Sequence, residues 1–485
     1  MTSVPNHPQR LSGNNFVAYK NISLFLLASL FFMLSSCDAL KKVPREDKSK
    51  ENEELEEIKG SRVYNPASGK WEEPSAPAST MDTIAWTEPS IDVAPPMTSD
   101  GSGDGSGDGI GVKKDEYNVA ILLPFMTNNF EDLDGRINQK SELAINFYGG
   151  MQMAFSELSE EGVKLNVSVH DTQASESVVS ELLENEKVAC ADLIIGPISK
   201  NNLKLVAEYT KAKKKPMVSP LSPSTSIAKD NPYYLQVSPG LEEHCKTISR
   251  HALDKYKPEQ LVLVCRNKKA ETNRLQYFQT ANQEHAGKSN VDPLKEFIVT
   301  DASIDFSEMD ITPYILSGKT TVFIVPSWSN ESFIYSLMRN VSIAKGKNKV
   351  VFYGMPQWMN FEQISYDYFE NLNLHVSSDT DINSDSDEVK RFKQNFYYKF
   401  GSLPEEEAYV GYDVMRYFGR ELFEGGTQFQ KTIDQNGKDM LHTRFALSPV
   451  APNDAKPEDY SKIERYENSY VNILQFKHFH FQLAD

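Results

Sequence analysis

The sequence predicts an α/β protein with two doubly wound parallel-sheet lobes. Short apolar runs without polar alternation recur along the chain, as in strands that are buried on both faces. Stretches with helical spacing lie between these runs, so strand and helix alternate and right-handed crossovers are expected. The alternation runs from Tyr117 to about residue 238 and then restarts at Leu241. Two successive series of similar size predict two lobes.

The first series opens with the apolar run from Tyr117 to Pro124, which predicts a buried strand. Ser199 is expected to open a helix as its N-cap, because a serine hydroxyl accepts from free amides at a helix N-terminus. Strands are expected at 117–124, 164–171, 192–197 and 216–220, and helices at 141–158, 175–185 and 199–211.

The second series repeats this alternation of strands and helices, and it closes with a strand-like segment at 470–476. His478 and His480 then fall on one face of a strand, with Phe479 and Phe481 on the other. Helices of this series are expected at 241–256, 271–285 and 331–343, and strands at 260–266, 295–299, 320–326 and 349–354.

The N-terminal region has the order of a secretory signal. Basic residues Arg10 and Lys20 precede an apolar run from Ile22 to Leu34, which ends in Leu34-Ser35-Ser36-Cys37. This ending resembles a bacterial lipobox. The resemblance implies a signal peptide at 1–36, cleavage before Cys37, and acylation of Cys37, which would anchor the mature chain in a membrane. The alternative, a short membrane helix with a chance cysteine, is disfavoured because the run is too short to span comfortably.

Residues 37–116 are predicted to form a disordered tether. A charged block, a Pro/Ser/Thr-rich stretch and an Asp/Gly/Ser repeat follow one another, and such composition buries too little apolar surface to offset the entropy of ordering. The repeat has no flanking scaffold for calcium and is interpreted as a linker. Trp71, Ile84 and Trp86 are candidates for a small element that docks elsewhere.

Charge and cysteine content narrow the function classes. The 485-residue chain has a net charge of −17, which disfavours a nucleic-acid partner because phosphate binding needs a basic face. Besides Cys37, the cysteines are Cys190, Cys245 and Cys265, without metal-type spacing. Cys190 and Cys265 stand in apolar runs and are expected to be buried. One disulfide among the three remains open.

Three stretches make residues 117–485 resemble the type 1 periplasmic-binding fold of the leucine/isoleucine/valine-binding class. The opening strand ends in Leu-Leu-Pro-Phe125. Residues 193–199 and 216–220 resemble the strand ends that line the ligand cleft, and 400–404 with 408–413 resembles a late helix signature. The resemblance implies a three-strand hinge, with lobe 1 at about 117–238 and 378–468 and lobe 2 at about 239–377 and 469–485.

In such a fold the loops at the carboxyl ends of the strands converge on an interlobe cleft, and helix N-termini favour an anion there. Family amino-acid binders usually hold the ligand ammonium with a lobe 2 carboxylate. Gln357 stands near that place without an acid beside it, so amino-acid specificity is not implied. The candidate ligand-binding residues are Ser199, Ser219 and Ser222 in lobe 1 and Trp328, Asn330, Gln357 and Trp358 in lobe 2. The alternative is that these residues are ordinary turn residues and lobe-packing aromatics.

The sequence contains only incomplete versions of the motifs for phosphate, calcium and other metal binding. The segment 317–320 ends like a phosphate loop, but Pro313 replaces the first glycine and a strand follows. The acidic run 379–387 lacks the glycine and glutamate of a calcium loop, and is interpreted as a hinge loop with Ser386 as a helix cap. His478 and His480 lack a third ligand. No enzyme, metal site or cofactor is expected.

The sequence therefore favours a membrane-anchored solute-binding lipoprotein that delivers a small polar or anionic ligand to a transporter or sensor. The alternative is a cell-envelope interaction protein with the same fold, such as a regulator of peptidoglycan synthesis. The long tether favours this alternative, because it would let the protein act at a distance from the membrane. Either would lie in the bacterial cell envelope, facing the periplasm or the surface.

Overall fold

The computed structural model describes residues 63–65, 70–72, 111–129, 139–288, 290–300, 306, 309–452 and 460–484. The expected signal peptide, Cys37, Ile84 and Trp86 lie outside these residues. Within the segment interpreted as a tether, β1 (Val63–Asn65) and β2 (Lys70–Glu72) pair as antiparallel strands that set Tyr64 opposite Trp71.

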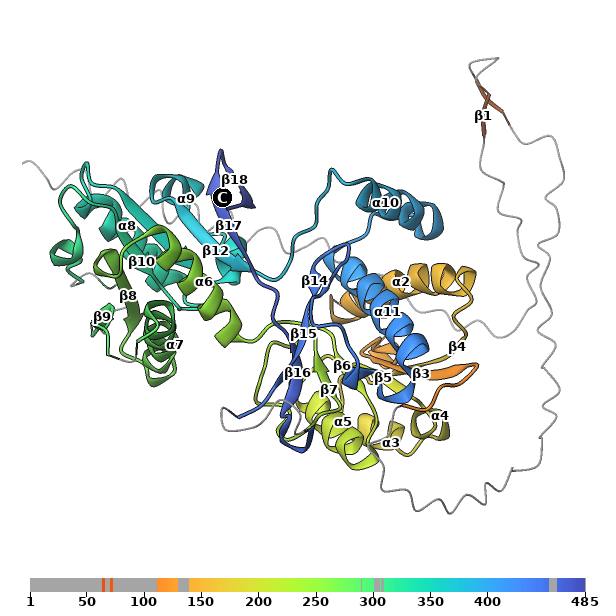
Figure 1. The fold of residues 1–485 in the computed structure, drawn as a ribbon. Helices are drawn as coiled ribbons and strands as arrows, with labels where there is room; N and C mark the ends of the chain where they lie inside the picture. Colours follow the sequence, from red (N-terminus) through yellow and green to blue (C-terminus); the bar gives the residue numbers. More distant parts are fainter. Residues whose placement is uncertain are drawn as a thin grey trace, which may run out of the picture. The chain divides into compact units, whose positions relative to one another are not determined.

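The first of two seven-stranded sheets lies in lobe 1, in the order β15-β16-β7-β6-β5-β3-β4 (Figure 1). Its neighbours are parallel except β15 and β16. Its strands are β3 (Tyr117–Leu123), β4 (Leu165–Asp171), β5 (Leu193–Ile195), β6 (Met217–Ser219), β7 (Tyr234–Gln236), β15 (Leu447–Val450) and β16 (Arg465–Asn468).

Both faces of this sheet are covered. Alternate residues of β3 divide between two clusters, as strand geometry requires: Val119 and Ile121 pack with α2 (Gln139–Glu160) and α11 (Glu406–Gly425). Ala120 and Leu122 pack with the other helices of this lobe. These are α3 (Glu176–Leu182), α4 (Glu186–Ala189) and α5 (Lys200–Lys213).

The second sheet lies in lobe 2, in the order β18-β17-β12-β11-β10-β8-β9. The five strands from β12 to β9 are parallel, whereas β17 and β18 are antiparallel to their neighbours. The strands are β8 (Leu261–Arg266), β9 (Lys295–Val299), β10 (Thr321–Ile324), β11 (Val350–Gly354), β12 (Leu374–Ser378), β17 (Asn472–Lys477) and β18 (His480–Leu483).

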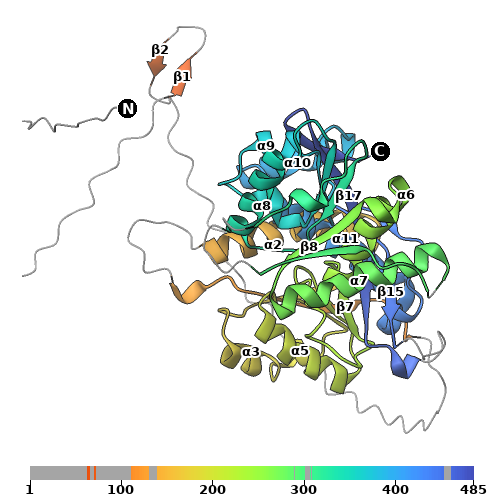
Figure 2. The ribbon, with the colours of Figure 1, turned by 90° about the vertical axis from the view of Figure 1, so that its left-hand side faces the viewer.

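Four α-helices pack on this sheet around a single core cluster (Figure 2). Helix α6 lies against α7, and α8 lies against α9. Their bounds are α6 (Leu241–Lys255), α7 (Lys269–Ala286), α8 (Glu331–Ala344) and α9 (Tyr366–Asn371).

The chain passes between the two sheets three times. The crossings lie between β7 and α6, between β12 and α10 (Asp387–Phe400), and between β16 and β17. Two parallel-dominated α/β lobes joined by three crossings are the architecture that the sequence predicted, so the fold class is confirmed. Short elements complete the fold: 3-10 helices η1 (Thr127–Asn129), η2 (Pro258–Gln260), η3 (Thr312–Tyr314), η4 (Pro356–Asn360), η5 (Gly426–Lys431) and η6 (Tyr460–Lys462), and strands β13 (Lys438–Asp439) and β14 (Arg444–Phe445).

Two expectations are corrected. Cys190 is exposed, not buried, because 186–190 forms the short helix α4 and its cap, and only Val188 is buried there. Residues 470–481 do not form one strand. His478 and Phe479 have φ of 55° and 62°, the two-residue turn of a hairpin, so β17 and β18 run antiparallel and His478 shares no strand face with His480.

The start of lobe 1 also differs from the sequence-based boundary. Residues 111–116 were placed in the tether, yet Val112 N donates to Thr427 Oγ1 at 3.2 Å and Lys114 Nζ lies 2.7 Å from Asp192 Oδ1. This segment therefore contacts η5 and Asp192, the residue directly before β5.

Candidate functional site

Strand order places the natural ligand position of each lobe. In lobe 1, β4-β3-β5-β6-β7 follows the 2-1-3-4-5 pattern, and in lobe 2 β9-β8-β10-β11-β12 does the same. In such sheets the loops at the carboxyl ends of the first and third strands diverge, and ligands bind in the crevice between them. The candidate edges are therefore the loops after β3 and β5 in lobe 1, and after β8 and β10 in lobe 2.

The loop after β5 requires a glycine. Gly196 has φ of +87°, and a Cβ there would lie 2.3 Å from Leu122 O of β3. The close approach turns the chain sharply toward Ser199, which caps α5 with a φ/ψ of −70° and 142°. The Ser199 side chain makes no capping hydrogen bond and is exposed. Its hydroxyl is thus available to another partner.

A half-buried carboxylate organises the loop after β3. Asp171 accepts from Met126 N, Thr127 N and Thr127 Oγ1 at 3.1, 2.8 and 2.7 Å, and from Gln173 N at 2.8 Å. Burial acts to raise the pKa of Asp171, but the hydrogen bonds from Thr127, Gln173 and Met126 outweigh it, so the pKa lies below its usual value. Sequence reasoning missed this residue.

Strained backbone gathers at the same edge. Met126, Gln173 and Ala174 have φ of 56°, 50° and 51°, a region that residues other than glycine rarely adopt. Strain of this kind persists where the surroundings enforce it, and it concentrates at binding and active sites.

Helices α3 and α5 frame a hollow of about 540 Å³ at this edge. Figure 2 shows the two helices side by side, and Asn201 Nδ2 donates to Glu176 Oε1 at 2.8 Å across them. Asn202, one residue further, is only 1% exposed, and neither Nδ2 nor Oδ1 has a hydrogen-bond partner among the described residues. The hollow is lined by residues 174–177 and 199–202.

Ser219 and Ser222 follow β6 but differ in accessibility. Ser219 is fully buried. Ser222 is half-buried, and its hydroxyl accepts from Ser224 N at 3.4 Å. Neither lines the hollow beside Ser199, so the structure does not gather the three serines into one pocket.

In lobe 2 the loop after β10 is fixed by its neighbours. Arg274 Nη1 donates to Pro326 O at 2.6 Å, and Trp358 Nε1 donates to Ser327 O at 2.8 Å. Asn330 caps α8 by accepting from Phe333 N at 2.8 Å. Two of the candidates, Asn330 and the fully buried Trp358, thus have structural contacts.

The remaining two candidates are more open. Trp328 is half-buried and meets the His244 ring edge-on, with centroids 5.7 Å apart. Gln357 is half-buried, and its Oε1 has no hydrogen-bond partner among the described residues.

Lobe 2 does hold an acid at its carboxyl edge, but that acid is already paired. Glu271 accepts from Arg266 N at 3.0 Å and from Arg266 Nε at 2.8 Å, and it is 4% exposed. Ser327 Oγ donates to the same carboxylate at 3.4 Å. Because Arg266 and Ser327 occupy it, Glu271 is not free to hold an ammonium group.

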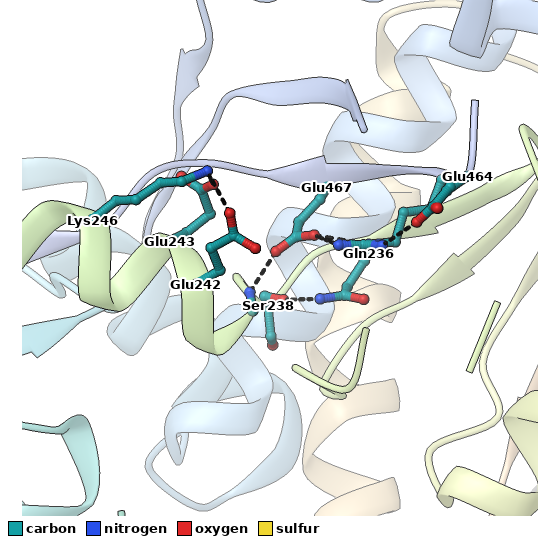
Figure 3. A network of polar contacts seen from close by, with 9 residues as sticks. Gln236, Ser238, Glu242, Glu243, Lys246, Glu464 and Glu467 are labelled. Atoms are coloured by element: carbon teal, nitrogen blue, oxygen red, sulfur yellow. Dashed lines mark hydrogen bonds and ion pairs between the residues drawn. The ribbon is translucent and has the colours of Figure 1, made fainter. Parts of the chain in front are cut away.

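A buried glutamate at the end of β16, just before the third crossing, accepts a hydrogen bond from the first crossing and pairs with an arginine on its own strand (Figure 3). Glu467 Oε1 accepts from Gly240 N at 2.7 Å, and Glu467 Oε2 accepts from Arg465 Nε at 2.8 Å. Gln236 Nε2 donates to Ser238 O at 2.9 Å beside them. A Cβ on Gly240 would lie 2.6 Å from Glu467 Oε1, so a larger residue there would displace the Glu467 side chain from this contact.

The second crossing is held by a buried aspartate on α11. Asp413 accepts from Leu441 N at 3.0 Å, from His442 N at 2.8 Å and contacts His442 Nδ1 at 2.5 Å. The segment 441–443 in turn contacts the second crossing: Asp381 N donates to His442 O at 2.7 Å, and Thr443 Oγ1 donates to Asp379 O at 2.5 Å. Asp413 ends the helix signature on which the family resemblance partly rests.

Comparison with known proteins decides the family. The model of the periplasmic binding protein family matches residues 141–435, more than half of the chain. The chain belongs to the periplasmic binding protein family. The resemblance of residues 117–485 to the periplasmic-binding fold is thereby confirmed. No curated protein matches the sequence.

Solved structures share the family fold at low identity. A protein from Rhodospirillum rubrum described as a branched-chain amino acid ABC transporter is similar, with TM-score 0.54, 10% identity and coverage of 76% of this chain and 99% of its own. A branched-chain amino acid ABC transporter periplasmic ligand-binding protein from Burkholderia xenovorans gives TM-score 0.52, 14% identity, and coverage of 76% and 94%. The C-domain of LpoA from Haemophilus influenzae, a regulator of PBP1A, gives 0.48, 12%, and 76% and 99%.

The described residues show neither a metal-binding cluster nor a membrane-spanning helix. Within the described ranges, no group of three His, Cys, Asp or Glu side chains is arranged to hold a metal ion. Ser386 caps α10 by accepting from Val389 N at 3.2 Å, as expected for the acidic hinge loop. No helix in the described part of the chain has the length and hydropathy that a membrane crossing needs.

Proposed function

We propose that this protein is a membrane-anchored solute-binding lipoprotein. It captures a small polar or anionic ligand in the hollow between α3 and α5 and delivers it to a transporter or sensor. The observation that carries the proposal is Asn202, whose buried carboxamide lines the hollow and has no hydrogen-bond partner within the described part of the chain. An unsatisfied buried polar group costs about 1–3 kcal/mol, which a hydrogen-bonding ligand would recover.

The groups around the hollow favour a ligand with an anionic end. The N-terminus of α5 directs free amides there, and Ser199 and Lys200 stand at the same place. Glu176 opposes a second negative charge, since its carboxylate also lines the hollow. A ligand with one anionic group and neutral donors or acceptors fits this set best.

Anchoring through Cys37 is part of the proposal. Acylation would hold the protein at a membrane of the bacterial envelope, and the 73 residues between Cys37 and Gly111 would give it reach away from the membrane. Family membership and the signal-like N-terminus support this placement.

A second candidate is a cell-envelope interaction protein that uses the same fold without a transported ligand. The pairing of Glu271 with Arg266, and the structural contacts of Asn330 and Trp358, favour it. These contacts leave lobe 2 with few free polar groups for a ligand.

A thermal-shift screen of amino acids, peptides, nucleosides and muropeptides separates the two candidates. A ligand at a hundredfold excess over its dissociation constant should stabilise the protein by about 2.7 kcal/mol. Ser199→Ala combined with Asn202→Leu should abolish the shift. Ser156→Ala, an exposed serine on α2 that bonds to its own helix, should leave it intact.

Two results would count against ligand capture. One is the absence of any shift together with crosslinking to an envelope protein, which moves the conclusion to the second candidate. The other is a shift that Ser199→Ala with Asn202→Leu leaves unchanged, which places the ligand elsewhere.

A further inference from the structure

The lobe 2 sheet ends in an unprotected edge. Strand β18 is the outermost strand beside β17, and among the described residues nothing pairs with its other side. Natural proteins usually protect such edges with lysine, proline or a bulge. Residues 480–483 read His-Phe-Gln-Leu and pair with β17 without a bulge. The edge therefore keeps its capacity to pair with another strand.

The hairpin register determines which main-chain groups face the open side. Ala484 N donates to Ile473 O at 2.9 Å, so 473 and 484 form a hydrogen-bonded pair. Such pairs alternate along antiparallel strands, which makes Gln475–Gln482 and Lys477–His480 hydrogen-bonded and Phe476–Phe481 and Leu474–Leu483 not. The amides and carbonyls of Phe481 and Leu483 therefore point away from β17.

Apolar side chains accompany these free groups. Phe481 and Leu483 lie two residues apart and share one face of the strand. Phe481 packs against Phe476, with ring centroids 4.9 Å apart, whereas Leu483 is 54% exposed. In the turn, Phe479 is 59% exposed although φ of 62° is unfavourable for a phenylalanine. A strand added at this edge would cover apolar surface as well as main-chain groups.

We propose that the edge of β18 pairs with β18 of a second copy of this chain, antiparallel and centred on Gln482. In this register Phe481 faces Leu483 of the other copy, and Leu483 faces its Phe481. Phe481 and Leu483 of both copies present outward amides and carbonyls. One hydrogen-bonded Phe481–Leu483 pair therefore forms on each side of a central Gln482–Gln482 pair. The strand is self-complementary in main chain and side chains alike, as a two-fold interface requires.

Charge does not oppose this pairing at the contact itself. From His480 to Ala484 the strand carries no acidic side chain and no lysine. The net charge of −17 repels two copies at longer range, and this repulsion is screened beyond about 8 Å at physiological salt. The association is therefore expected to strengthen as salt is raised.

Sedimentation equilibrium of the purified full chain, in density-matched detergent, tests the proposal. The protein should show a monomer–dimer equilibrium. Leu483→Pro removes one outward amide per copy, and an outward position on an edge strand tolerates proline, so dimerisation should weaken at least about tenfold with unchanged melting. Ile298→Lys, on the opposite edge of the same sheet, is the matched control and should dimerise normally.

Cysteine crosslinking tests the register in a Cys190→Ser background, which removes the exposed native thiol. Gln482→Cys should form a disulfide-linked dimer on mild oxidation, because facing residues of a non-hydrogen-bonded pair lie about 4.5 Å apart. His480→Cys, on the same strand face but away from the centre, should not.

The proposal is overturned by a monomer at every concentration, by a Leu483→Pro protein that dimerises like the native one, or by equal crosslinking at 480 and 482. Protection of the Phe481 and Leu483 amides by a different protein, with the native chain monomeric, would also overturn it.

Discussion

His375 is a buried histidine whose neutral form stabilises lobe 2. It lies on β12, stacked on Tyr353 with centroids 4.9 Å apart, and Nδ1 lies 3.0 Å from Asn373 O. Burial lowers the pKa of His375 to about 4, against the hydrogen bond that its ring donates to the Asn373 carbonyl, which acts to raise it. The folded state thus binds its proton less readily than the unfolded chain does.

This difference predicts a loss of stability in mild acid. The contribution of His375 is complete above its unfolded pKa near 6.5 and is lost as the pH falls toward about 4. At full extent the loss is about 3 kcal/mol. Unfolding of the native protein and of His375→Phe, measured by denaturant between pH 7 and pH 4, should show a shallower decline for the variant.

The exposed His480 offers the matched control. His480→Gln should keep the decline of the native protein. Parallel curves for the native protein and His375→Phe would contradict the assignment.

Single residues were predicted from sequence where a local rule decides. Ser386 as a helix cap followed from its position before α10, and the capping bond is present. Cys190 was misjudged because an apolar run was taken for burial, whereas a short helix turns that side chain outward. Asp171, Asp413 and Glu467 were missed, since each bonds to groups far away in sequence.

Helices α2 and α11 pack closely where a glycine of each helix faces the backbone of the other. A Cβ on Gly150 would lie 1.8 Å from Ala408 O, and one on Gly411 would lie 1.9 Å from Phe147 O. The two backbones therefore touch directly, which brings the core of this face of lobe 1 together.

Gly150→Ala should force the two helices apart and destabilise the protein by about 3 kcal/mol or more. The adjacent Gly149→Ala is the control, because its Cβ would meet only side-chain rings, that of Phe396 at 3.2 Å and that of Phe400 at 3.7 Å, among its nearest neighbours. A small net change is expected there, since alanine favours a helix over glycine by about 1 kcal/mol. Equal melting of the two variants would contradict direct backbone contact at the crossing.

Elements were predictable where apolar period and length agree. The strands from β3 to β11 that the sequence indicated are present. Most of them, such as β3, β8 and β11, are buried on both faces and read as continuous apolar runs, whereas β4 and β9 are partly exposed. The final hairpin was not, because its turn is His478-Phe479 rather than the usual Asn-Gly. Strands β15 and β16, at one edge of the lobe 1 sheet, carry charged and polar residues, so the sequence contains no apolar run that indicates them.

At the scale of the whole molecule, Glu467, just before the third crossing, accepts a hydrogen bond from the first crossing. Glu467→Gln keeps the shape but leaves Arg465, whose side chain is 10% exposed, with only the more exposed Glu464 as a charged partner. Breaking a buried pair in this way costs about 3–5 kcal/mol, so the chemical-denaturation midpoint should fall sharply. Glu464→Gln, which removes the more exposed carboxylate 3.4 Å from Arg465, should change it little; equal effects would contradict a buried clamp.

Anchoring is the second prediction at this scale. Metabolic labelling with a palmitate analogue should mark the protein, and Cys37→Ala should abolish both labelling and membrane association. A Cys37→Ala protein that still labels and stays at the membrane would contradict acylation at this residue.

The site was less predictable than the fold. Ser199 follows from the sequence because it opens a helix after a buried strand. The choice of hollow depends on strand order and on Asn202, whose unpartnered amide no sequence rule indicates. The lobe 2 candidates Asn330 and Trp358 were named as loop residues, but their partners, Phe333 N and Ser327 O, appear only in three dimensions.

Native mass spectrometry of the protein purified from the cells that make it tests solute capture most directly, since it needs no prior choice of ligand. The account predicts a small molecule bound beyond the mass of the acylated chain, released on unfolding and missing from Asn202→Leu. A native protein that carries only its own mass, or an adduct that Asn202→Leu retains equally, would contradict capture in the hollow between α3 and α5.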